Sequence, residues 1–384
     1  MQFEFATSNR IIFGQGVLSE VPPIAQTLGT KAFIVTGRSL ERITPLLTQL
    51  ESCVPAYACF QVPGEPSIDL VAEAVKSARN EQCDLVIAMG GGSAIDVGKA
   101  VAAMLTNEGD LLTYLEVVGQ GKPITHHPVP MIAIPTTAGT GAEVTRNAVL
   151  SVPEHRRKVS MRHPWMLPDV AVIDPELTYH LPPNLTATTG LDAMTQLIEP
   201  FVSGHNNPLT DGLCKEGIQR AARSLKIAYF DGVNRQARED MAIASLFGGL
   251  ALANAKLGAV HGFAGPIGGL TNAPHGAVCG RLLPLVMNAN IKALQSRSPD
   301  SPALARYQQL APLITGNAQA NAGDAVAWIQ DLCNSMKIPA LKQLGLTTSL
   351  IPEVAEQSRN SSSMKGNPIE LGREELEVIL LKGL

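Results

Sequence analysis

The second half of the chain holds one carboxylate and two imidazoles in settings that favour a metal ion. Asp192 stands near the start of the apolar segment GLDAMTQLIEPF, and His261 and His275 follow it, fourteen positions apart and each followed by glycine. The small residues around both histidines leave room for an ion and a substrate. One oxygen and two nitrogen ligands suit Zn²⁺, Fe²⁺ or a similar divalent ion. These three residues are therefore candidate metal ligands, and the two histidines are candidate catalytic residues.

Gln196 is the neighbour of this set that decides its chemistry. It lies four residues after Asp192, and side chains at i and i+4 point to the same face of a helix. An amide is a poor ligand, so metal occupancy depends on this position. Cys279 follows His275 at the same spacing, and we interpret it as a small core residue.

A glycine-rich turn between a strand and a helix indicates a bound nucleotide. The run MGGGSAIDVGKA places Gly90, Gly91 and Gly92 at the end of an apolar segment, with Ser93 opening a helix. Glycines let the backbone approach a pyrophosphate, and the N–H groups at a helix start bind the anion. The spacing differs from GxGxxG, so this motif alone is a weak signal.

A second loop supports the same interpretation. The run IPTTAGTGAEVT follows another apolar strand, and Thr136, Thr137 and Thr140 carry hydroxyl groups that can donate to a phosphate or a carboxamide. Two such loops after neighbouring strands favour a bound dinucleotide over two plain turns.

Alternating strands and helices fill residues 1–180. Strands are expected at 31–37, 54–60, 84–90, 130–137, 148–151 and 170–176. Helices are expected at 38–50, 67–80 and 93–105, with Ser67 as the N-cap of the second. This alternation predicts a parallel, doubly wound sheet, and hence an α/β dinucleotide-binding domain over 1–180.

The pattern becomes helical after the breaker cluster LPPN at 181–184. Helices are expected at 186–203, 208–227, 234–256, 302–313, 322–335, 349–358 and 373–383. We therefore predict a second, all-α domain over 181–384 that carries the metal and the substrate.

Composition excludes several classes of partner. With 384 residues, 45% of them apolar, the chain is long enough for two or three domains. A net charge of −4 and a pI near 6.1 argue against nucleic acid or an anionic membrane, and we interpret the basic run at 155–158 as a solvated loop. We expect neither a membrane span nor a signal peptide. Six scattered cysteines without CxxC spacing indicate reduced thiols and a cytoplasmic location.

Four motifs, in order, resemble those of the iron-containing (group III) alcohol dehydrogenase family. They are the GGGS-x-x-D run, IPTTAGTGAEVT, the TGLDA segment and the HG…PHG block, and the resemblance covers essentially the whole chain. It implies a dehydroquinate synthase-like fold, with the active site in the cleft between an α/β and a helical domain. It also implies hydride transfer between NAD(P) and a small alcohol or aldehyde, assisted by Fe²⁺ or Zn²⁺, in a homodimer or larger homo-oligomer.

The resemblance assigns roles residue by residue. The implied cofactor-binding residues are Gly37, Gly90, Gly91, Gly92, Ser93, Asp96, Thr136, Thr137, Thr140 and Lys158. The implied metal ligands are Asp192, His261 and His275, with Gln196 at the fourth position, which is normally a histidine. Losing one metal-supporting residue typically costs about 10–100-fold in affinity.

Two further departures from the family pattern concern the substrate and the cofactor. Gly265 stands four residues after His261, where many members have another histidine, so protons would travel through water, ribose hydroxyls or His275. At the end of the first expected strand this chain has Gly37, Arg38 and Ser39, whereas NAD-preferring members often have an aspartate there. NADP(H) is therefore a candidate beside NAD(H).

Three alternatives to a metal-assisted dehydrogenase stay open. The first is a metal-independent reductase of an unsaturated oxo-acid, similar to maleylacetate reductase, with Arg146 and Lys158 receiving a substrate carboxylate. The second is a lyase resembling dehydroquinate synthase, which the scarcity of basic substrate-binding residues disfavours. The third is a nucleotide-binding protein without catalysis.

Overall fold

The computed structural model of the protein describes residues 2–54 and 56–384. They form two compact units. The sheet unit consists of Thr7–Thr137 and Gly141–Thr178, and the helical unit consists of Tyr179–Leu384, Ala138–Thr140 and the described residues up to Ala6. Ala6 is attached to the helical unit through Asn254, whose side chain accepts from the Ala6 N–H at 2.7 Å and donates to its carbonyl at 3.0 Å.

The sheet unit is built on a six-stranded sheet in the order β1-β8-β5-β4-β2-β3, and every neighbouring pair is parallel. Its strands are β1 (Arg10–Phe13), β2 (Lys31–Thr36), β3 (Ala56–Gln61), β4 (Leu85–Gly90), β5 (Met131–Pro135) and β8 (Val170–Ile173). All residues of β4 and β5 are buried, because a parallel sheet is covered on both faces and its central strands need continuous apolar runs. The expected parallel, doubly wound sheet is confirmed.

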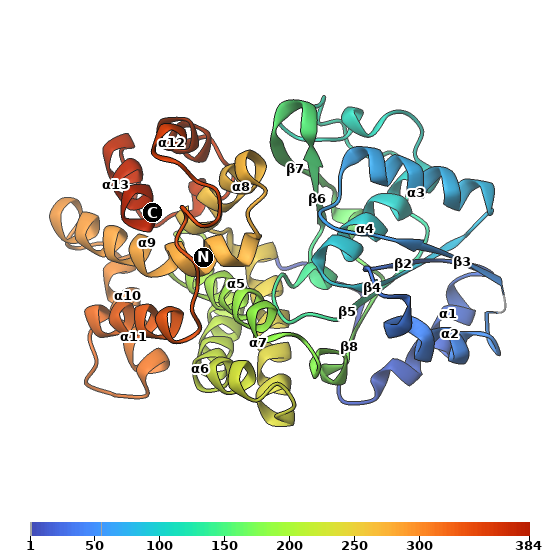
Figure 1. Cartoon of the computed structure of the whole chain (residues 1–384), viewed down its shortest axis with the longest axis horizontal. Coiled ribbons are helices and arrows are strands. Elements are labelled where there is room, and N and C mark those ends of the chain that lie inside the picture. The colour runs from blue at the N-terminus through green and yellow to red at the C-terminus, as the bar shows by residue number, and fades with distance from the viewer. Residues whose placement is uncertain (1, 55) are drawn as a thin grey trace. The chain divides into compact units, whose positions relative to one another are not determined.

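Helices cover both faces of this sheet (Figure 1). Helices α1 (Val21–Leu28) and α2 (Thr44–Leu50) pack on one face, and α3 (Ile68–Asn80) and α4 (Gly92–Thr106) pack on the other. Ser67 caps α3 as expected, since its hydroxyl accepts from the Leu70 N–H at 3.2 Å. The strand expected at 54–60 is observed as β3, and residue 55 lies outside the described residues.

A two-stranded antiparallel sheet corrects one interpretation. The strand expected at 148–151 is β6 (Asn147–Val152), and it pairs with β7 (Arg157–Arg162). The basic run at 155–158 is therefore not a solvated loop throughout, because Arg157 and Lys158 open a strand. In β7, whose sequence is RKVSMR, only Val159 and Met161 are buried, and the other residues are polar or charged. The alternation of apolar and polar residues is therefore too short to predict a strand from sequence.

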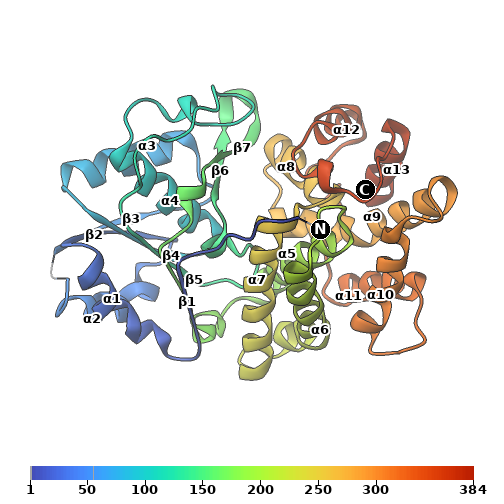
Figure 2. The same ribbon diagram turned by 180° about the vertical axis from the view of Figure 1, so that it is seen from behind.

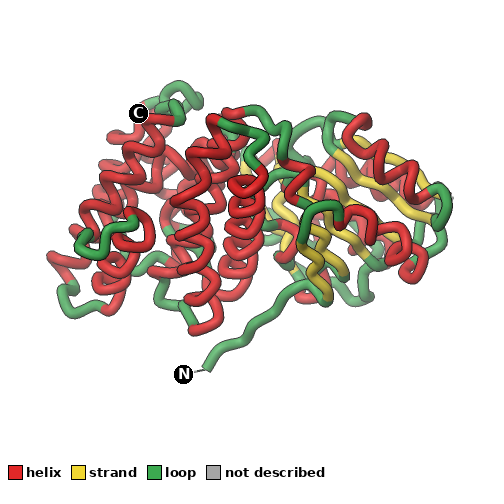
Figure 3. The backbone as a smooth tube through the Cα atoms, turned by 90° about the horizontal axis from the view of Figure 1, so that it is seen from below, coloured by secondary structure: helices red, strands yellow, loops and turns green. Residues whose placement is uncertain are grey.

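The helical unit contains helices and loops in the part of the chain that the structure describes (Figure 3). Its helices are α5 (Pro183–Val202), α6 (Pro208–Phe230), α7 (Arg235–Ala255), α8 (Ala259–Thr271), α9 (His275–Arg297), α10 (Pro302–Thr315), α11 (Ala322–Ser335), α12 (Ile351–Arg359) and α13 (Arg373–Gly383). Helices α5, α6 and α7 lie side by side (Figure 2), and α5 also packs against α9. This arrangement buries nearly all of α5 after its first turn.

Two of these helices, α8 and α9, have no counterpart among the expected helices. Each contains an internal proline, Pro266 and Pro284, and several glycines, which lower intrinsic helix propensity. Most of their apolar side chains are nevertheless buried, with Phe263 in α8 and Leu282 in α9 among the core residues. Tertiary packing therefore overrides local propensity in the two helices that carry the histidines.

Within the described residues, no single helix is long and apolar enough to cross a membrane. Helices α7 and α8 pass that test only when they are taken together, and the chain bends by 99° between them. All six cysteines are free thiols, as expected.

Candidate active site

Helix α5 presents three polar side chains to the interior of the helical unit. Asp192, Gln196 and Glu199 follow one another at i, i+4 and i+7, so they share one face of the helix. They are 2%, 3% and 5% exposed, which is unusual for charged and amide side chains. Glu199 was not anticipated as a site residue, although its spacing from Asp192 within an apolar segment was a usable signal.

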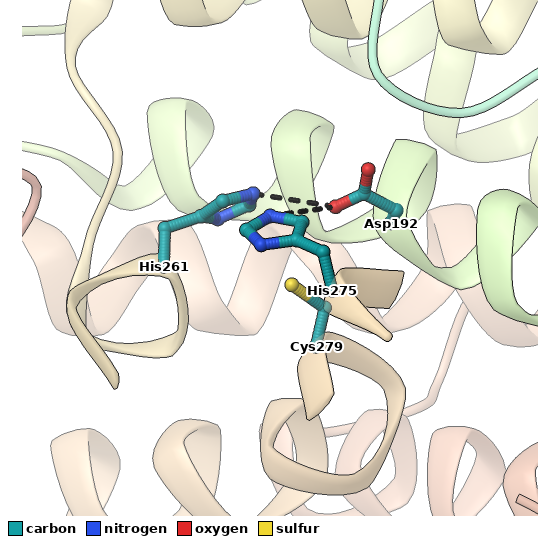
Figure 4. A group of neighbouring side chains, drawn as sticks. All are labelled: Asp192, His261, His275 and Cys279. Atoms are coloured by element: carbon teal, nitrogen blue, oxygen red, sulfur yellow. Dashed lines mark ion pairs between the residues drawn. The ribbon is translucent and has the colours of Figure 1, made fainter. Parts of the chain in front are cut away.

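The two candidate histidines converge on Asp192 (Figure 4). Nε2 of His261 lies 3.4 Å from Asp192 Oδ1, and Nε2 of His275 lies 3.6 Å from the same oxygen. Cys279 completes the cluster, and the four ligand atoms all lie within 4.8 Å of one another. The structure thus brings together the three residues that the sequence analysis selected, and it adds a thiol.

Close packing of α9 on α5 makes this convergence possible. A Cβ atom on Gly276 would lie 2.2 Å from the carbonyl oxygen of Thr188, and one on Gly280 would lie 2.6 Å from Leu191 Cδ1. The backbone contact makes glycine necessary at 276, and a side chain at 280 would force Leu191 to move. The first turns of α9, which carry His275 and Cys279, can therefore approach the middle of α5.

Glu199 orients His261. Its Oε2 atom lies 2.6 Å from Nδ1 of His261, and its Oε1 atom accepts from the Val260 N–H at 2.7 Å. A carboxylate that holds the Nδ1 proton leaves Nε2 as the metal-binding atom, the arrangement found behind histidine ligands. Burial lowers the pKa of His261, but Asp192 and Glu199 outweigh it and raise the pKa to about 9. A metal ion must therefore displace a proton from this ring.

Three buried polar atoms of the cluster have no hydrogen-bond partner: Asp192 Oδ1, His261 Nε2 and Gln196 Oε1. Buried polar atoms in folded proteins almost always have partners, so this concentration calls for a missing ligand. Burial opposes ionisation of Asp192, but His275, His261 and the Cys279 thiol together hold its pKa below the ordinary value. A carboxylate, two imidazoles and unsatisfied acceptors fit a divalent cation.

Replacing Glu199 by glutamine tests its role behind the metal. The Glu199→Gln variant is expected to bind Zn²⁺ about 10–100-fold more weakly, because an amide has no charge and only one acceptor oxygen for the two contacts that Glu199 makes. Competition against a chromophoric chelator measures this affinity. Glu353→Gln, an exposed change on α12, is the matched control and leaves the affinity unchanged. Equal affinities of the two variants would contradict the role of Glu199.

The nucleotide-site candidates gather at the carboxyl edge of the parallel sheet. The chain proceeds from β2 to β3 on one side and returns to β4 on the other, so the strand order reverses between β2 and β4. Ligands of doubly wound sheets bind at such a switch point. Gly37 follows β2 and Gly90 ends β4, and a Cβ on Gly90 would lie 3.3 Å from the Gly37 nitrogen and 2.6 Å from Ala94 Cβ. The two chain segments are therefore in close contact.

The second predicted loop adjoins the first. The Thr136 N–H donates to the Gly90 carbonyl at 2.9 Å, and a Cβ on Gly91 would lie 3.5 Å from Thr137 Oγ1. Helix α4 begins at Gly92, with Ser93 in its first turn, so the positive end of its dipole lies at these loops. Thr140, the third threonine predicted to bind the cofactor, belongs to the helical unit and not to the sheet unit.

Two further residues that the sequence analysis predicted to bind the cofactor make contacts within the protein. Asp96 accepts from the Val149 N–H at 3.0 Å and lies 3.8 Å from Lys99. Lys158 is 9% exposed at its side chain, and its Nζ lies 2.9 Å from Glu65 Oε2. Their contacts with a cofactor stay predictions.

A buried ion cluster beneath this site escaped the sequence analysis. Lys99, on α4, is 1% exposed and donates to Thr145 Oγ1 at 2.8 Å and to the Asn147 carbonyl at 2.9 Å. Burial lowers its pKa to about 8, against the pull of Asp96 and Glu143. Burial likewise raises the pKa of Asp96 to about 6 and that of Glu143 to about 7. The cluster ties the helix behind the glycine-rich loop to the start of β6.

A doubly wound sheet with a glycine-rich and a threonine-rich loop at its switch point, in one chain with a helical unit that holds a carboxylate–imidazole cluster, is typical of nucleotide-dependent dehydrogenases. Comparison with known families narrows this class. Residues 8–175 match the family model described as "Iron-containing alcohol dehydrogenase". Residues 186–384 match a second model, described as "Fe-containing alcohol dehydrogenase family, C-terminal". The chain belongs to the iron-containing alcohol dehydrogenase family.

Individual relatives agree with this assignment. A 1,3-propanediol dehydrogenase from Klebsiella pneumoniae is 36% identical over 389 residues, which span 98% of this chain and 97% of that protein. Alcohol dehydrogenase 4 of Saccharomyces cerevisiae is 35% identical over 378 residues, 96% of this chain and 95% of the relative.

Solved structures extend the similarity to the fold. A 1,3-propanediol oxidoreductase aligns with a TM-score of 0.92 at 34% identity over 100% of both chains. Sulfoacetaldehyde reductase from Bifidobacterium kashiwanohense, solved in complex with NAD⁺, aligns with a TM-score of 0.88 at 30% identity over 100% of this chain and 99% of the other. The family resemblance, the fold class and the dehydrogenase class inferred from the sequence are confirmed.

Proposed function

We propose that the protein transfers a hydride between NAD(P) and a small alcohol or its aldehyde, with a divalent metal held by Asp192, His261 and His275. The observation that carries this proposal is that both Nε2 atoms lie near one buried carboxylate oxygen, Asp192 Oδ1, which has no hydrogen-bond partner. A bound divalent ion would polarise the carbonyl or stabilise the alkoxide from which hydride leaves.

The chain's own residues have distinct roles in this proposal. Asp192 contributes the negative charge that attracts the cation, and Glu199 keeps the proton of His261 on Nδ1. Gly265, one turn after His261 on α8, has open space where a side chain would begin. That position therefore offers room for substrate and no proton carrier. The alcohol proton then leaves through water, the cofactor ribose hydroxyls or His275, whose side chain is 36% exposed.

Metal removal tests the proposal directly. The purified protein is treated with a chelator, and alcohol-dependent reduction of NAD⁺ and NADP⁺ is measured before and after addition of Zn²⁺ or Fe²⁺. We expect activity to disappear with the metal and to return at about one ion per chain. 1,3-Propanediol is the first substrate to try, because a similar protein is named for it. Full activity without metal would contradict the proposal.

That contrary outcome would favour the metal-independent reductase of an unsaturated oxo-acid. Such a reductase needs a cation for the substrate carboxylate, and Lys158 was one candidate. Its Nζ already pairs with Glu65 at 2.9 Å, so a substrate carboxylate would have to displace that glutamate. The unsatisfied acceptors around Asp192 also have no role in a reaction without a metal. We therefore favour the metal-assisted dehydrogenase.

We also propose that Arg38 makes the protein accept NADP(H). Its Nε donates to the Pro63 carbonyl and its own carbonyl accepts from Gln61 Nε2 at 3.1 Å, which holds the exposed guanidinium beside the ends of β2 and β3. No carboxylate stands in the run Thr36-Gly37-Arg38-Ser39 to repel a 2′-phosphate.

Removing this guanidinium should change the choice of cofactor. Loss of one charge-assisted contact of about 1.5–3 kcal/mol lowers kcat/KM for NADP⁺ about 10–100-fold in Arg38→Ala and leaves NAD⁺ nearly unaffected. Steady-state kinetics with both cofactors measure the ratio. Arg42→Ala, an exposed arginine in the following turn, is the control. Equal losses of kcat/KM for both cofactors would show that Arg38 does not bind the 2′-phosphate of NADP⁺.

The assembly and the compartment are proposals that rest on the family resemblance and on the free thiols. We propose a homodimer or larger homo-oligomer, which sedimentation velocity of the full chain measures. We propose a cytoplasmic location, because six free cysteines suit a reducing compartment.

A further inference from the structure

The position of the fourth metal ligand is occupied by an amide whose nitrogen is already engaged, while its Oε1 has no hydrogen-bond partner. Gln196 Nε2 donates to Asp192 Oδ2 at 3.2 Å, which turns Oδ1 of the same carboxylate toward the two histidines. Gln196 therefore acts on the carboxylate that binds the metal. The remaining question, which rests on the proposed metal-assisted function, is which side chain replaces the missing histidine.

Cys279 is placed where such a replacement is needed. It follows His275 by one turn of α9, and its Sγ lies within 4.8 Å of the ligand atoms of Asp192, His261 and His275 (Figure 4). The side chain is fully buried. The Cys279 thiol also interacts with the Asp192 carboxylate.

A second observation shows that the space beside this thiol is built for a cation. Asp192 Oδ1 and His261 Nε2 belong to side chains that are more than nine-tenths buried, and neither atom has a hydrogen-bond partner. Cys279 belongs to the apolar core of the helical unit, as Cys214 does, but its thiol also lies within 4.8 Å of the ligand atoms of a carboxylate and two imidazoles.

We propose that Cys279 is the fourth metal ligand of this protein, while Gln196 orients Asp192 from behind. The resulting set of one carboxylate, two imidazoles and one thiolate contains only ligand types that zinc sites use. Ligand bonds of about 2.0–2.3 Å draw the four atoms closer together than they lie without an ion, which side-chain rotation accommodates. The thiol proton passes to solvent when the metal binds, because only the thiolate is a ligand.

The thiolate gives this site properties that a third imidazole would not. Its negative charge and that of Asp192 together neutralise a divalent ion, which lowers the electrophilic strength of the metal toward a bound alcohol. Sulfur also favours zinc over the harder ions magnesium and manganese. We therefore expect this site to prefer zinc over magnesium and manganese.

X-ray absorption at the zinc edge tests the proposal on the full-length protein loaded with one equivalent of Zn²⁺. We expect one sulfur scatterer at about 2.3 Å. In Cys279→Ala this scatterer disappears and zinc binds at least about 10-fold more weakly by chelator competition. Cys214→Ala is the matched control, because Cys214 is equally buried in the same apolar cluster and lies outside the ligand group. It keeps both the scatterer and the affinity.

The outcomes separate this inference from the proposed function. Stoichiometric zinc without sulfur in its shell, or unchanged affinity in Cys279→Ala, overturns the role of Cys279 and leaves the metal-assisted dehydrogenase intact. Loss of the metal in Gln196→Ala with retention in Cys279→Ala assigns the fourth position to the amide and also overturns it. A wild-type protein that binds no zinc, iron or cobalt overturns both the inference and the metal-assisted function.

Discussion

Replacement of Asp192 by asparagine is expected to abolish metal binding and to lower alcohol oxidation at least ~10³-fold, because metal assistance supplies several kcal/mol of charge stabilisation. Asparagine has nearly the same shape, so packing around α5 is retained. The substitution removes the negative charge of the Asp192 carboxylate. The Nε2 atoms of His261 and His275 both lie near this carboxylate. Elemental analysis and initial rates with a saturating alcohol measure the two effects.

A matched control separates charge from folding in this experiment. Asp331→Asn removes an exposed carboxylate from α11 of the same unit and is expected to change neither metal content nor rate. Thermal unfolding of the metal-free proteins checks that Asp192→Asn remains folded. If Asp192→Asn retains stoichiometric metal and more than about a tenth of the rate, the metal does not contribute as proposed.

The second large effect is on stability. Lys99→Met is expected to destabilise the sheet unit by about 3–5 kcal/mol, the cost of removing one partner from a buried ion pair. Methionine fills a similar volume but leaves Asp96 and Glu143 without their buried cation. Because Lys99 also anchors α4 to Thr145, nucleotide binding should weaken with the loss of stability. Urea unfolding measures the change, with Lys76→Met, an exposed lysine on α3, as the control.

The pH dependence of the Lys99→Met effect has a definite sign. Without the cation, the pKa values of the buried carboxyl groups rise further above those of the unfolded chain, which lie near about 4. The folded variant then binds more protons than the unfolded one, so its stability falls as pH rises through this range. The cost of Lys99→Met should therefore be smaller at about pH 5 than at about pH 8. An equal cost at both values would show that the charge of Lys99 is not responsible.

Local sequence patterns predicted those parts of the protein that depend on neighbours along the chain. The buried strands β2, β4 and β5 are continuous apolar runs, and Ser67 caps α3 through a contact three residues away. Residue type and spacing likewise selected Asp192, His261 and His275, which the structure brings together, and two glycine- or threonine-rich loops, which it places in contact. Each of these features leaves a signal within a short window.

Features that depend on packing between distant segments were missed. Glu199 reaches His261 across 62 positions, and the thiol of Cys279 reaches Asp192 only because Gly276 and Gly280 let α9 lie against α5. Lys99 is buried beside Asp96 and Glu143, although its charge gave no reason to expect burial. No window of a single sequence contains both partners of such a contact. The three-dimensional arrangement was therefore needed to place Glu199 and Cys279 in the site.

The proposed metal ligands come from α5, α8 and α9, which also form the apolar interior of the helical unit. We therefore expect metal binding to stabilise the folded state of this unit. At a free ion concentration 100 times the dissociation constant, binding adds about 2.7 kcal/mol to the stability of a folded protein. In a cell, the abundance of this enzyme would then follow the supply of the ion. A shortage of the metal would then make the chain more susceptible to proteolysis and would also abolish its activity.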